Sequence, residues 1–480
     1  MTRLNRTPRV KLVATAISLA VLTGCASVNF DQSIAKTNRD AADFTAGRLT
    51  LAQTNAQREV SERTAAELLK QPLGQSDAVQ LALVNSPALQ AMLAENWANA
   101  ANAAQSGRIA NPLFTFERLR IGDELELGRL LSFGLLDLLT LPQRNAIAQR
   151  RIAQGQLRLT SDVIDQVTQV RQAWVKAVAA QQSLIYAKQV FDSAEASAEL
   201  ARRMQAAGNF NKLARARQQV FYTDAATQLA GAQHMATSTR EELIRLLGLT
   251  DAQADQLKLS DRLPDLPKAA RDPAEVSKLA SASRLDIRMA QSAFEASAKA
   301  QGLNLLTSFT DIELGIRRDT KFDDAAGTKT TGRGFEIGLR LPIFDWGGTQ
   351  RDAMNAQTLA AANRLEAAVR AAGSNLREGY SAYRTAYDVA RHYRDEVIPL
   401  RKTISEENVL RYNGMLIGVF EFLADSRAEV GSVMAAIAAE QQFWLADAAL
   451  QASVMGKPVM ASTAAMTGGG SGSGGGDAAH

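Results

Sequence analysis

A strand that leads directly into a very long helix constrains this chain more than any other feature. Between Arg333 and Gly348 the sequence reads RGFEIGLRLPIFDWGG, where apolar and polar residues first alternate one by one. That period of two is typical of a strand with one apolar and one polar face. After Gly347 and Gly348 the pattern is helical for roughly 60 residues, which at about 1.5 Å per residue gives a helix of about 90 Å. A compact domain has no use for such a helix, so the stretch favours a barrel continued by a coiled-coil tube.

The composition fits close-packed helices and gives no reason to expect a nucleic-acid partner. Only 6% of the residues are aromatic, and alanine is common among the 46% that are hydrophobic. Lysine and arginine total 54 against 50 for aspartate and glutamate, so the net charge of +4 is nearly balanced. The sequence shows no alternating basic and aromatic face. Nucleic-acid binding is therefore set aside.

Residues 1–24 resemble the signal peptide of bacterial lipoproteins. Several basic residues precede an apolar run from Leu12 to Leu22, and Leu22-Thr-Gly-Cys25 then forms a small-residue cleavage site. The only cysteine, Cys25, is thus the predicted lipidation site at the start of the mature protein. The apolar run of about 11 residues is too short for a transmembrane helix. An ordinary secretory signal with a chance cysteine is the alternative interpretation.

The lipoprotein signal has consequences for the residues that follow it. Residues 25–71 would form a lipid-anchored N-terminal tether, in which 60–70 look helical. Ala26 and Ser27 follow the cysteine, and the absence of aspartate there fits sorting to the outer membrane by resemblance to known lipoproteins.

Residues 72–249 read as a helix, a strand hairpin and a long helical hairpin. The predicted elements are a helix over 78–105 with Ser76 as N-cap, strands between Leu113 and Pro142 around a turn at Gly122-Asp123, a helix from Gln143 to about Ala207, and a helix over Lys212–Leu247. The leucine run at 135–139 fits neither period well, so a helical turn competes with a strand there. Gly248 is the predicted C-cap of the last helix.

The long helix carries apolar residues at spacings of four and three, as in a coiled-coil seam. These residues are Val163, Val167, Val170, Trp174 and Ala177.

After a proline-containing connector over 250–272, residues 273–456 repeat this order. The predicted elements are a helix over Ala274–Gln301, a strand over Phe309–Arg318, a polar loop over Asp319–Gly332, the strand described above, a long helix, a reversal at Gly414 and a returning helix over Val419–Val454. Pro399 should kink the long helix locally. Residues 457–480 are rich in glycine and serine and are predicted to be disordered.

The two halves correspond closely enough to indicate a tandem duplication. Leu141-Pro142-Gln143-Arg144 in the first half corresponds to Leu341-Pro342 followed by Gln350-Arg351 in the second. MQAAG at 204–208 corresponds to LRYNG at 410–414, which gives an offset close to 206 residues. Pro142, Pro342, Trp346, Gly347 and Gly348 mark the expected strand-to-helix junctions.

Four strands in one chain are too few for a closed barrel, which needs about eight or more. Strands of about 9–11 residues are long enough to cross a bilayer when tilted, and open sheet edges are not tolerated in lipid. Association of copies removes the edges. Three copies would supply twelve strands and would align the long helices into one hollow cylinder.

Taken together, the signal ending in LTGC, the duplicated hairpins, the LPIFDWGG junction and the paired glycine turns resemble the TolC-type outer-membrane efflux proteins, in particular their lipoprotein branch. The resemblance covers about residues 72–456. It implies a mainly α fold with a small transmembrane β part, in which a homotrimer forms a 12-stranded β-barrel continued by an α-helical periplasmic tunnel. Such a trimer is a passive exit duct in the outer-membrane lipid, docked to a periplasmic membrane-fusion adaptor and an inner-membrane pump.

The resemblance also implies a gate at the periplasmic mouth. Family members often place acidic side chains just after the second helical reversal, where Glu421 and Asp425 are the counterparts. Three copies of one carboxylate around a narrow axis would repel one another and attract cations. The alternative is that Glu421 is simply a solvated helix residue.

Gly208 and Gly414 match the tip turns that receive the adaptor in this family. Both glycines are also expected to take a positive φ, and that requirement alone could explain them.

The sequence offers no catalytic or cofactor site. The histidines His234, His392 and His480 lie at no metal-ligand spacing with one another or with cysteine. No cofactor is expected, and any energy for export must come from a partner. A periplasmic coiled-coil scaffold lipoprotein without a pore is the competing interpretation, although a scaffold has no use for four two-faced strands. The sequence leaves the substrate open between metal ions, drugs and solvents.

Overall fold

The computed structural model describes residues 29–45, 47–307, 312–339, 343–344 and 347–458. It consists of two compact units, each assembled from several segments of the chain. The first contains residues 94–159 and 286–369 together with the N-terminal segment up to Ser33, and the second contains residues 34–93, 160–285 and 370 onward. Each unit draws on both predicted repeats, because the divisions fall inside the long helices.

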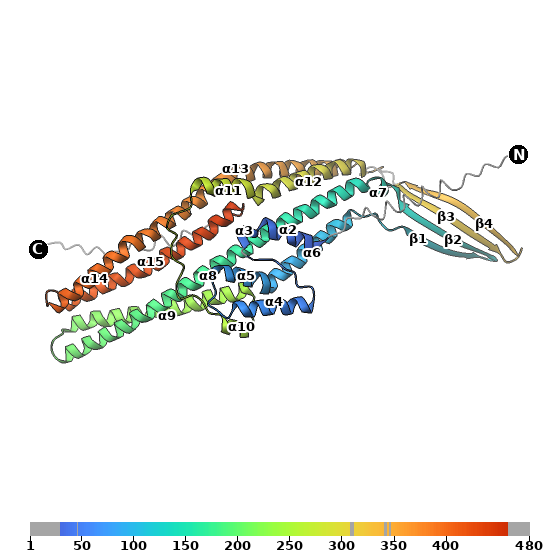
Figure 1. Ribbon diagram of the computed structural model, residues 1–480. Coiled ribbons are helices and arrows are strands. Elements are labelled where there is room, and N and C mark those ends of the chain that lie inside the picture. Colours follow the sequence, from blue (N-terminus) through green and yellow to red (C-terminus); the bar gives the residue numbers. More distant parts are fainter. Residues whose placement is uncertain (1–28, 46, 308–311, 340–342, 345–346, 459–480) are drawn as a thin grey trace. The chain divides into compact units, whose positions relative to one another are not determined.

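The first unit holds one antiparallel sheet in the order β1-β2-β3-β4 (Figure 1). Its strands are β1 Leu113–Ile121, β2 Glu124–Gly134, β3 Ile312–Asp323 and β4 Thr328–Leu339. Gly122 and Gly327 take φ values of 59° and 62° in the two hairpin turns, a backbone conformation that glycine adopts without strain. The structure thus confirms the predicted first hairpin and its turn at Gly122-Asp123.

The second hairpin is longer than the sequence pattern indicated. The predicted polar loop over Asp319–Gly332 is wrong, because β3 continues to Asp323, β4 begins at Thr328, and only four residues connect them. The polar residues of this stretch pair across the two strands, for example Thr320 with Thr331. A polar pattern that suggested a loop therefore belongs to a regular ladder between two strands. Phe309, the predicted start of β3, lies outside the described residues.

Two helices that appeared continuous in the sequence are each broken. The predicted helix over 78–105 divides into α5 Gln75–Asn85 and α6 Pro87–Ser106, because Pro87 holds Ser86 in an extended conformation. Gly74 rather than Ser76 is the N-cap of α5.

The predicted helix over 274–301 likewise divides into α11 Pro273–Ser283 and α12 Leu285–Thr307. At the break, the buried Arg284 side chain donates a hydrogen bond of 2.6 Å to the carbonyl oxygen of Ala372. A long-range contact of this kind leaves no local signal in the sequence.

The leucine run after β2 forms a short helix, α7 Leu135–Leu139, so the competing interpretation of that run was the correct one. Asp137 forms an ion pair of 2.5 Å with Arg144 in the next helix. This pair fixes the direction in which the chain leaves the sheet.

Long helices form two hairpins of equal length. The first consists of α8 Leu141–Ala206 and α9 Lys212–Leu247, and the second of α13 Gly348–His392, η1 Tyr393–Val397, α14 Ile398–Asn413 and α15 Val419–Val454. From Leu141 to Gly348, from Ala206 to Asn413, from Lys212 to Val419 and from Leu247 to Val454, the offset is a constant 207 residues. The fold is thus duplicated without insertion in these helices, and the offset of 206 taken from the tip sequences was one residue short.

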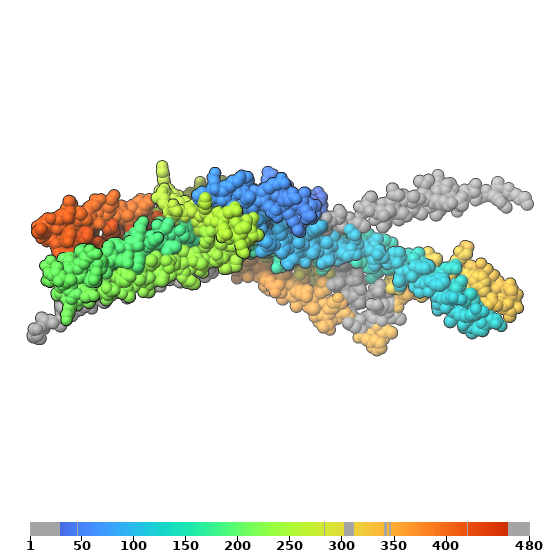
Figure 2. All heavy atoms as spheres, turned by 90° about the horizontal axis from the view of Figure 1, so that it is seen from below, coloured from blue at the N-terminus to red at the C-terminus, as the bar shows by residue number. Residues whose placement is uncertain are grey.

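In the second unit, both hairpin tips lie at the same end (Figures 1 and 2). The predicted seam of α8, from Val163 to Ala177, is buried at every position. Trp174 on that seam donates a hydrogen bond of 2.8 Å to the carbonyl oxygen of Leu73. The remaining helices are α2 Phe30–Asp40, α3 Ala42–Thr45, α4 Asn55–Leu68 and α10 Asp251–Gln256.

Aromatic side chains of the second hairpin hold the connector that joins the halves. Tyr383, Tyr387 and Phe443 form a buried cluster with ring centroids 5.6 to 5.7 Å apart. The Tyr387 hydroxyl donates to the carbonyl oxygen of Pro267 at 3.1 Å, and the Trp444 indole donates to that of Pro264 at 3.1 Å. Tyr387 thus buries its ring and satisfies its hydroxyl on the connector.

None of the helices in the described part of the chain combines the length and the apolar character that crossing a bilayer requires.

The C-cap of α9 offers a sharp test of this packing. Gly248 has a φ of 66°, and a Cβ there would lie 2.3 Å from Cδ of Pro87. We expect Gly248→Ala to lower the free energy of unfolding by about 2–4 kcal/mol, from strain at positive φ and from overpacking. Gly231→Ala in the same helix meets no atom within 4 Å and should stabilise by up to about 1 kcal/mol. Thermal melts of helical ellipticity measure both, and equal melting temperatures for the two variants would contradict the assignment.

Candidate functional site

The sheet has two faces of different chemistry, as the alternation in the sequence predicted. Cross-strand partners in an antiparallel sheet project to the same side. The register places Phe335 beside Ile316 and Ile337 beside Leu314, and it places Leu131 beside Ile316 from the other strand. We call this side the apolar face. Its apolar residues in the described strands also include Phe114, Phe116, Phe133, Ile312 and Leu339.

Most of these apolar side chains are exposed in the single chain, with Phe335 at 78%, while Phe133, Ile312 and Leu314 are half-buried. A contiguous apolar surface of this kind marks contact with a membrane or a partner rather than with water.

We call the opposite side of the sheet the acidic face. Its acidic side chains are Glu117, Glu124, Glu126, Glu313, Asp319, Asp323 and Glu336, and its basic side chains are Arg317 and Lys321. Both basic groups are paired, Arg317 with Asp319 at 2.9 Å and Lys321 with Glu124 at 3.6 Å. The remaining excess of carboxylates makes this surface hydrated and attractive to cations.

Both edges of the sheet lack a neighbouring strand within the described part of the chain. β1 pairs only with β2, and β4 pairs only with β3. Every residue of β1 and β4 is exposed. Each edge therefore presents a row of backbone donors and acceptors that another strand can satisfy.

The two hairpin tips use the same hydrogen-bond pattern, but not at the two glycines expected from sequence. At the first tip the amide of Asn209 donates to the carbonyl oxygen of Met204, and Gly208 takes a φ of 80°. At the second tip the amide of Leu416 donates to the carbonyl oxygen of Arg411, so the left-handed position falls one residue later, on Met415, with a φ of 58°.

The expectation of a positive φ at Gly414 was wrong, since its φ is −78°. With the offset of 207 residues, Met415 is the structural counterpart of Gly208. A methionine in this conformation is costly and uncommon. Its side chain is 92% exposed, and the neighbouring Leu416 is 78% exposed. No pattern in the sequence marks Met415, because glycine at 414 was the obvious choice for the turn.

The structure separates the two acidic residues expected near the second tip. Glu421 lies in the first turn of α15 and is exposed. Asp425 accepts a hydrogen bond from the amide of Asn408, which is buried on the facing helix α14. Asp425 therefore joins the two helices of its own hairpin. Sequence reasoning had no means of identifying Asn408 as a partner.

Arg427 is one of the residues through which the two hairpins touch near their tips. The guanidinium of Arg427 on α15 lies 4.4 Å from the ring centroid of Phe221 on α9, and it donates to Gln218 at 3.5 Å. Burial lowers the pKa of Arg427 from its usual value. The contact links the outer part of one hairpin to the other.

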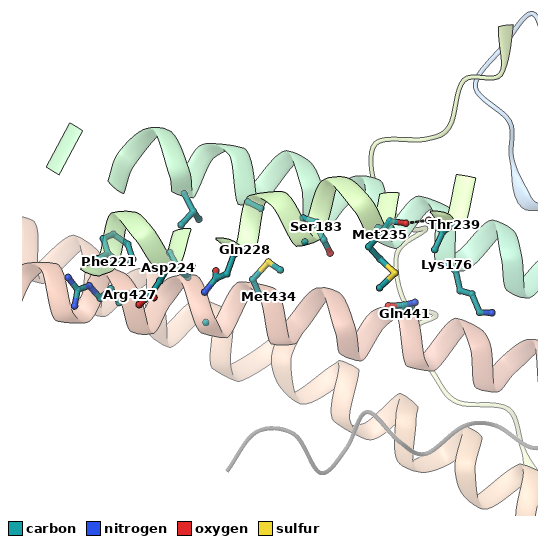
Figure 3. Close-up of a pocket in the computed structure, with 17 residues that line it drawn as sticks. Lys176, Ser183, Phe221, Asp224, Gln228, Met235, Thr239, Arg427, Met434 and Gln441 are labelled. Atoms are coloured by element: carbon teal, nitrogen blue, oxygen red, sulfur yellow. Dashed lines mark hydrogen bonds between the residues drawn. The ribbon is translucent and has the colours of Figure 1, made fainter. Parts of the chain in front are cut away.

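A cavity of about 870 Å³ lies between α8, α9 and α15 (Figure 3). Arg427 and Phe221 lie at one end, Lys176 at the other, and Met235 and Met434 line it between. Lys176 pairs with Glu242 at 3.3 Å. The lining is mainly apolar.

Of the predicted strand-to-helix junctions, Pro142 lies in the first turn of α8, where its missing amide costs nothing. Gly347 takes a φ of 69°, and Gly348 begins α13. Cys25, Pro342 and Trp346 lie outside the described residues.

The proline in the long second helix produces a π-helical turn rather than a simple bend. Residues Tyr393–Val397 form the turn, and the amide of Ile398 donates to the carbonyl oxygen of Tyr393, five residues earlier. Pro399 follows and cannot donate to the carbonyl four residues before it, so the wider turn accommodates the missing bond.

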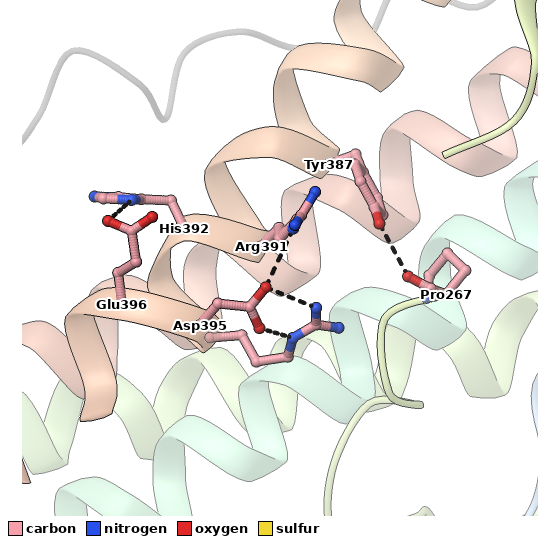
Figure 4. A network of polar contacts seen from close by, with 7 residues as sticks. Pro267, Tyr387, Arg391, His392, Asp395 and Glu396 are labelled. Carbon is pink, nitrogen blue, oxygen red and sulfur yellow. Dashed lines mark hydrogen bonds and ion pairs between the residues drawn. The ribbon is translucent and has the colours of Figure 1, made fainter. Parts of the chain in front are cut away.

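Ion pairs surround this turn on its exposed side (Figure 4). Asp395 accepts from Arg394 at 2.7 Å and from Arg391 at 3.1 Å. These hydrogen bonds lower the pKa of Asp395 to about 2. His392 and Glu396 pair at 3.3 Å beside them.

Within the described residues, no group of three or more histidine, cysteine, aspartate or glutamate side chains is placed to hold a metal ion.

Comparison with known proteins finds one matching family model and several solved structures with a similar fold. The family model described as "Outer membrane efflux protein" matches residues 276–405. Among curated proteins the sequence finds no match. A membrane protein from Pseudomonas aeruginosa superposes with a TM-score of 0.64 at 18% identity, covering 85% of this chain and 95% of that one.

Two solved channels are similar in the same way. The CmeC outer membrane channel of Campylobacter jejuni gives a TM-score of 0.67 at 13% identity, covering 83% of this chain and 87% of that one. The open state of the MtrE outer membrane channel of Neisseria gonorrhoeae gives 0.61 at 18% identity, covering 79% and 88%. At these identities the structural likeness establishes the fold, while the family match is independent of it.

The region beside the connector yields a prediction about pH. Burial, together with the negative charge of Asp265, raises the pKa of Glu440 on α15. The folded state therefore holds this proton more tightly than the unfolded state, and stability falls as pH rises from the unfolded pKa, about 4.3, through the folded pKa. We expect Glu440→Gln to raise the melting temperature at pH 8 and to have no effect at pH 4. Because Glu440 is partly exposed, the gain in the free energy of unfolding should stay below about 1 kcal/mol.

Asp395→Asn is the matched control for Glu440→Gln. Because the pKa of Asp395 is lowered to about 2, its ion pairs persist at both pH values. The control should therefore destabilise at pH 4 and at pH 8, and a Glu440→Gln gain that is independent of pH would contradict the burial argument.

Proposed function

We propose that the chain forms the outer-membrane channel of a tripartite efflux system, because the family model described as "Outer membrane efflux protein" matches residues 276–405 and the fold is that of solved outer membrane channels. In this role a homotrimer is a passive exit duct. A periplasmic membrane-fusion adaptor and an inner-membrane pump deliver the substrate and supply the energy. The protein performs no catalysis of its own.

One observation carries the proposal: a four-stranded sheet with an apolar face, an acidic face and two open edges. In hydrocarbon an unpaired sheet edge costs several kcal/mol for each unsatisfied backbone group. Pairing β4 of one copy with β1 of the next removes both edges, and three copies give a closed barrel of twelve strands. The apolar face then meets lipid, and the acidic face lines a hydrated lumen.

The helical hairpins that leave the sheet extend this channel into the periplasm as a tunnel. β2 leads through α7 into α8, and β4 leads into α13, so each strand pair continues into one hairpin. A lipid attached to Cys25 would anchor the N-terminal tether in the outer membrane.

Purified protein in a planar bilayer tests the channel directly. We expect heat-modifiable trimers that conduct ions with a preference for cations, because carboxylates line the proposed lumen. A monomeric protein that gives no conductance would instead favour a scaffold without a pore.

We further propose that Glu421 narrows the periplasmic mouth of this channel. Three copies of the exposed carboxylate around the axis would repel one another and bind cations. Glu421→Gln should then raise single-channel conductance and weaken its dependence on divalent cations. Glu407→Gln on α14, another exposed acidic residue, serves as the control. Identical traces for Glu421→Gln and the native protein would exclude the gate role.

The turns at Gly208 and Met415, rather than Gly208 and Gly414, are our proposed adaptor-docking positions. Met415→Gly removes an exposed apolar side chain and also relieves its positive φ. We expect this variant to melt at a higher temperature and yet to crosslink to the adaptor at least several-fold less. Unchanged crosslinking would show that Met415 serves only the turn.

A further inference from the structure

We propose that a row of arginines on the apolar face binds the phosphate groups of anionic lipid in the outer leaflet of the membrane. The inference rests on the proposed function for the placement of the sheet in a membrane. It goes beyond that function because it assigns a lipid partner to particular side chains.

Three arginines lie side by side across three neighbouring strands. The register pairs Arg129 of β2 with Arg318 of β3, and Arg318 with Arg333 of β4. Partners of this kind have Cβ atoms about 4.5–5.5 Å apart. The three guanidinium groups thus form one continuous row on the apolar face.

Other cations on the same face extend the row toward the hairpin turns. Arg118 pairs in register with Leu127, and Lys329 pairs with Phe322, whose ring centroid lies 5.1 Å from the lysine nitrogen. Arg120 also projects to this face, but it reaches Asp324 in the turn at 3.0 Å. The described strands place no acidic residue on the apolar face.

The arginine row is costly unless an anion covers it. Like charges directly opposite one another destabilise a sheet. Within the described residues, Arg129, Arg318 and Arg333 have no ion pair, whereas Arg317 and Lys321 on the acidic face are both paired. Opposite charges that could neutralise the row lie on the other side of the sheet. The complement must therefore come from outside the chain.

The position of the row along the strands selects the outer leaflet. On β3 the apolar residues Ile312, Leu314 and Ile316 come first from the helical end, and Arg318 follows them toward the turn. Ile312 and Arg318 are six residues apart, about 20 Å along a strand at about 3.3 Å per residue. A tilted strand leaves the apolar band of about 25 Å near this point. With the helices in the periplasm, the turns face outward and the arginines reach the outer head groups.

Phosphate is the anion that fits such a row best. A guanidinium group donates two parallel hydrogen bonds to a phosphate, and adjacent groups can share one phosphorylated head group. A lipid also satisfies the neighbouring apolar rows with its acyl chains, which a free ion cannot do. The chemistry therefore indicates a phosphorylated glycolipid or phospholipid of net negative charge.

The test compares the trimer with a variant that carries Arg129→Gln, Arg318→Gln and Arg333→Gln. Bisphosphorylated lipid A is titrated into protein in zwitterionic nanodiscs, and the rise in melting temperature gives an apparent affinity. At about 1 kcal/mol for each cation near an anionic surface, losing three should weaken this affinity about a hundredfold. Without anionic lipid the variant should melt no lower than the native protein, because its like-charge contacts are gone.

Two further variants separate the proposal from general effects of charge and folding. The triple Arg→Lys variant keeps the charges and should retain most of the lipid response, even if the glutamine variant folds poorly. The pair Arg317→Gln and Lys321→Gln removes cations from the acidic face and should leave the response unchanged. An equal response in the native and triple glutamine proteins, or an equal loss in the acidic-face pair, would overturn the proposal.

The same samples test whether the phosphate comes from lipid or from free phosphate, and whether the protein forms a channel at all. Inorganic phosphate should not reproduce the shift in melting temperature, and a matching shift would overturn the assignment to lipid. Native protein that conducts while showing no lipid response would refute this inference and leave the channel intact. Native protein that neither trimerises nor conducts would refute both.

Discussion

The unpaired backbone of β1 and β4 is the constraint on which the rest of this structure depends. A chain with four strands exposes two sheet edges, which are costly in hydrocarbon, and an apolar face, which is costly in water. In the proposed trimer, association through those edges would satisfy the backbone, and the apolar character of one face would place that face against lipid. The acidic residues on one face and the apolar residues on the other are what the wall of such a barrel would require, with water inside and lipid outside.

Local patterns were sufficient where the chain's periodicity is strong. The first hairpin, the seam from Val163 to Ala177 and the ends of α9 all lie where the sequence placed them. The polar stretch after Arg318 misled because small and charged residues are typical of loops, whereas here they pair across two regular strands. Had the alternation been followed through to Thr331, the pairing of Arg318 with Arg333 would have been visible in the sequence, but not that of Arg129 with Arg318.

Other features depend on contacts that no local pattern records. The break at Arg284 coincides with a hydrogen bond to Ala372, and Asp425 is engaged by Asn408 from the facing helix. At the second tip the glycine at 414 suggested the left-handed position, yet the hydrogen bonds place it on Met415. Pro399 correctly predicted where the long helix is irregular. The irregularity is a π turn bordered by ion pairs, and that form depends on the surrounding helix.

The constant spacing of the two helical hairpins has a consequence for symmetry. Because both hairpins have the same number of residues and the same tip hydrogen bonds, three chains around an axis would present six nearly identical tips at the rim of the assembly. A partner that reads only the backbone would find six equivalent places to bind, whereas one that reads side chains would find two alternating sets of three. Because Gly208 at one turn corresponds to Met415 at the other, the side chains of the rim would have threefold symmetry although its backbone would be nearly sixfold.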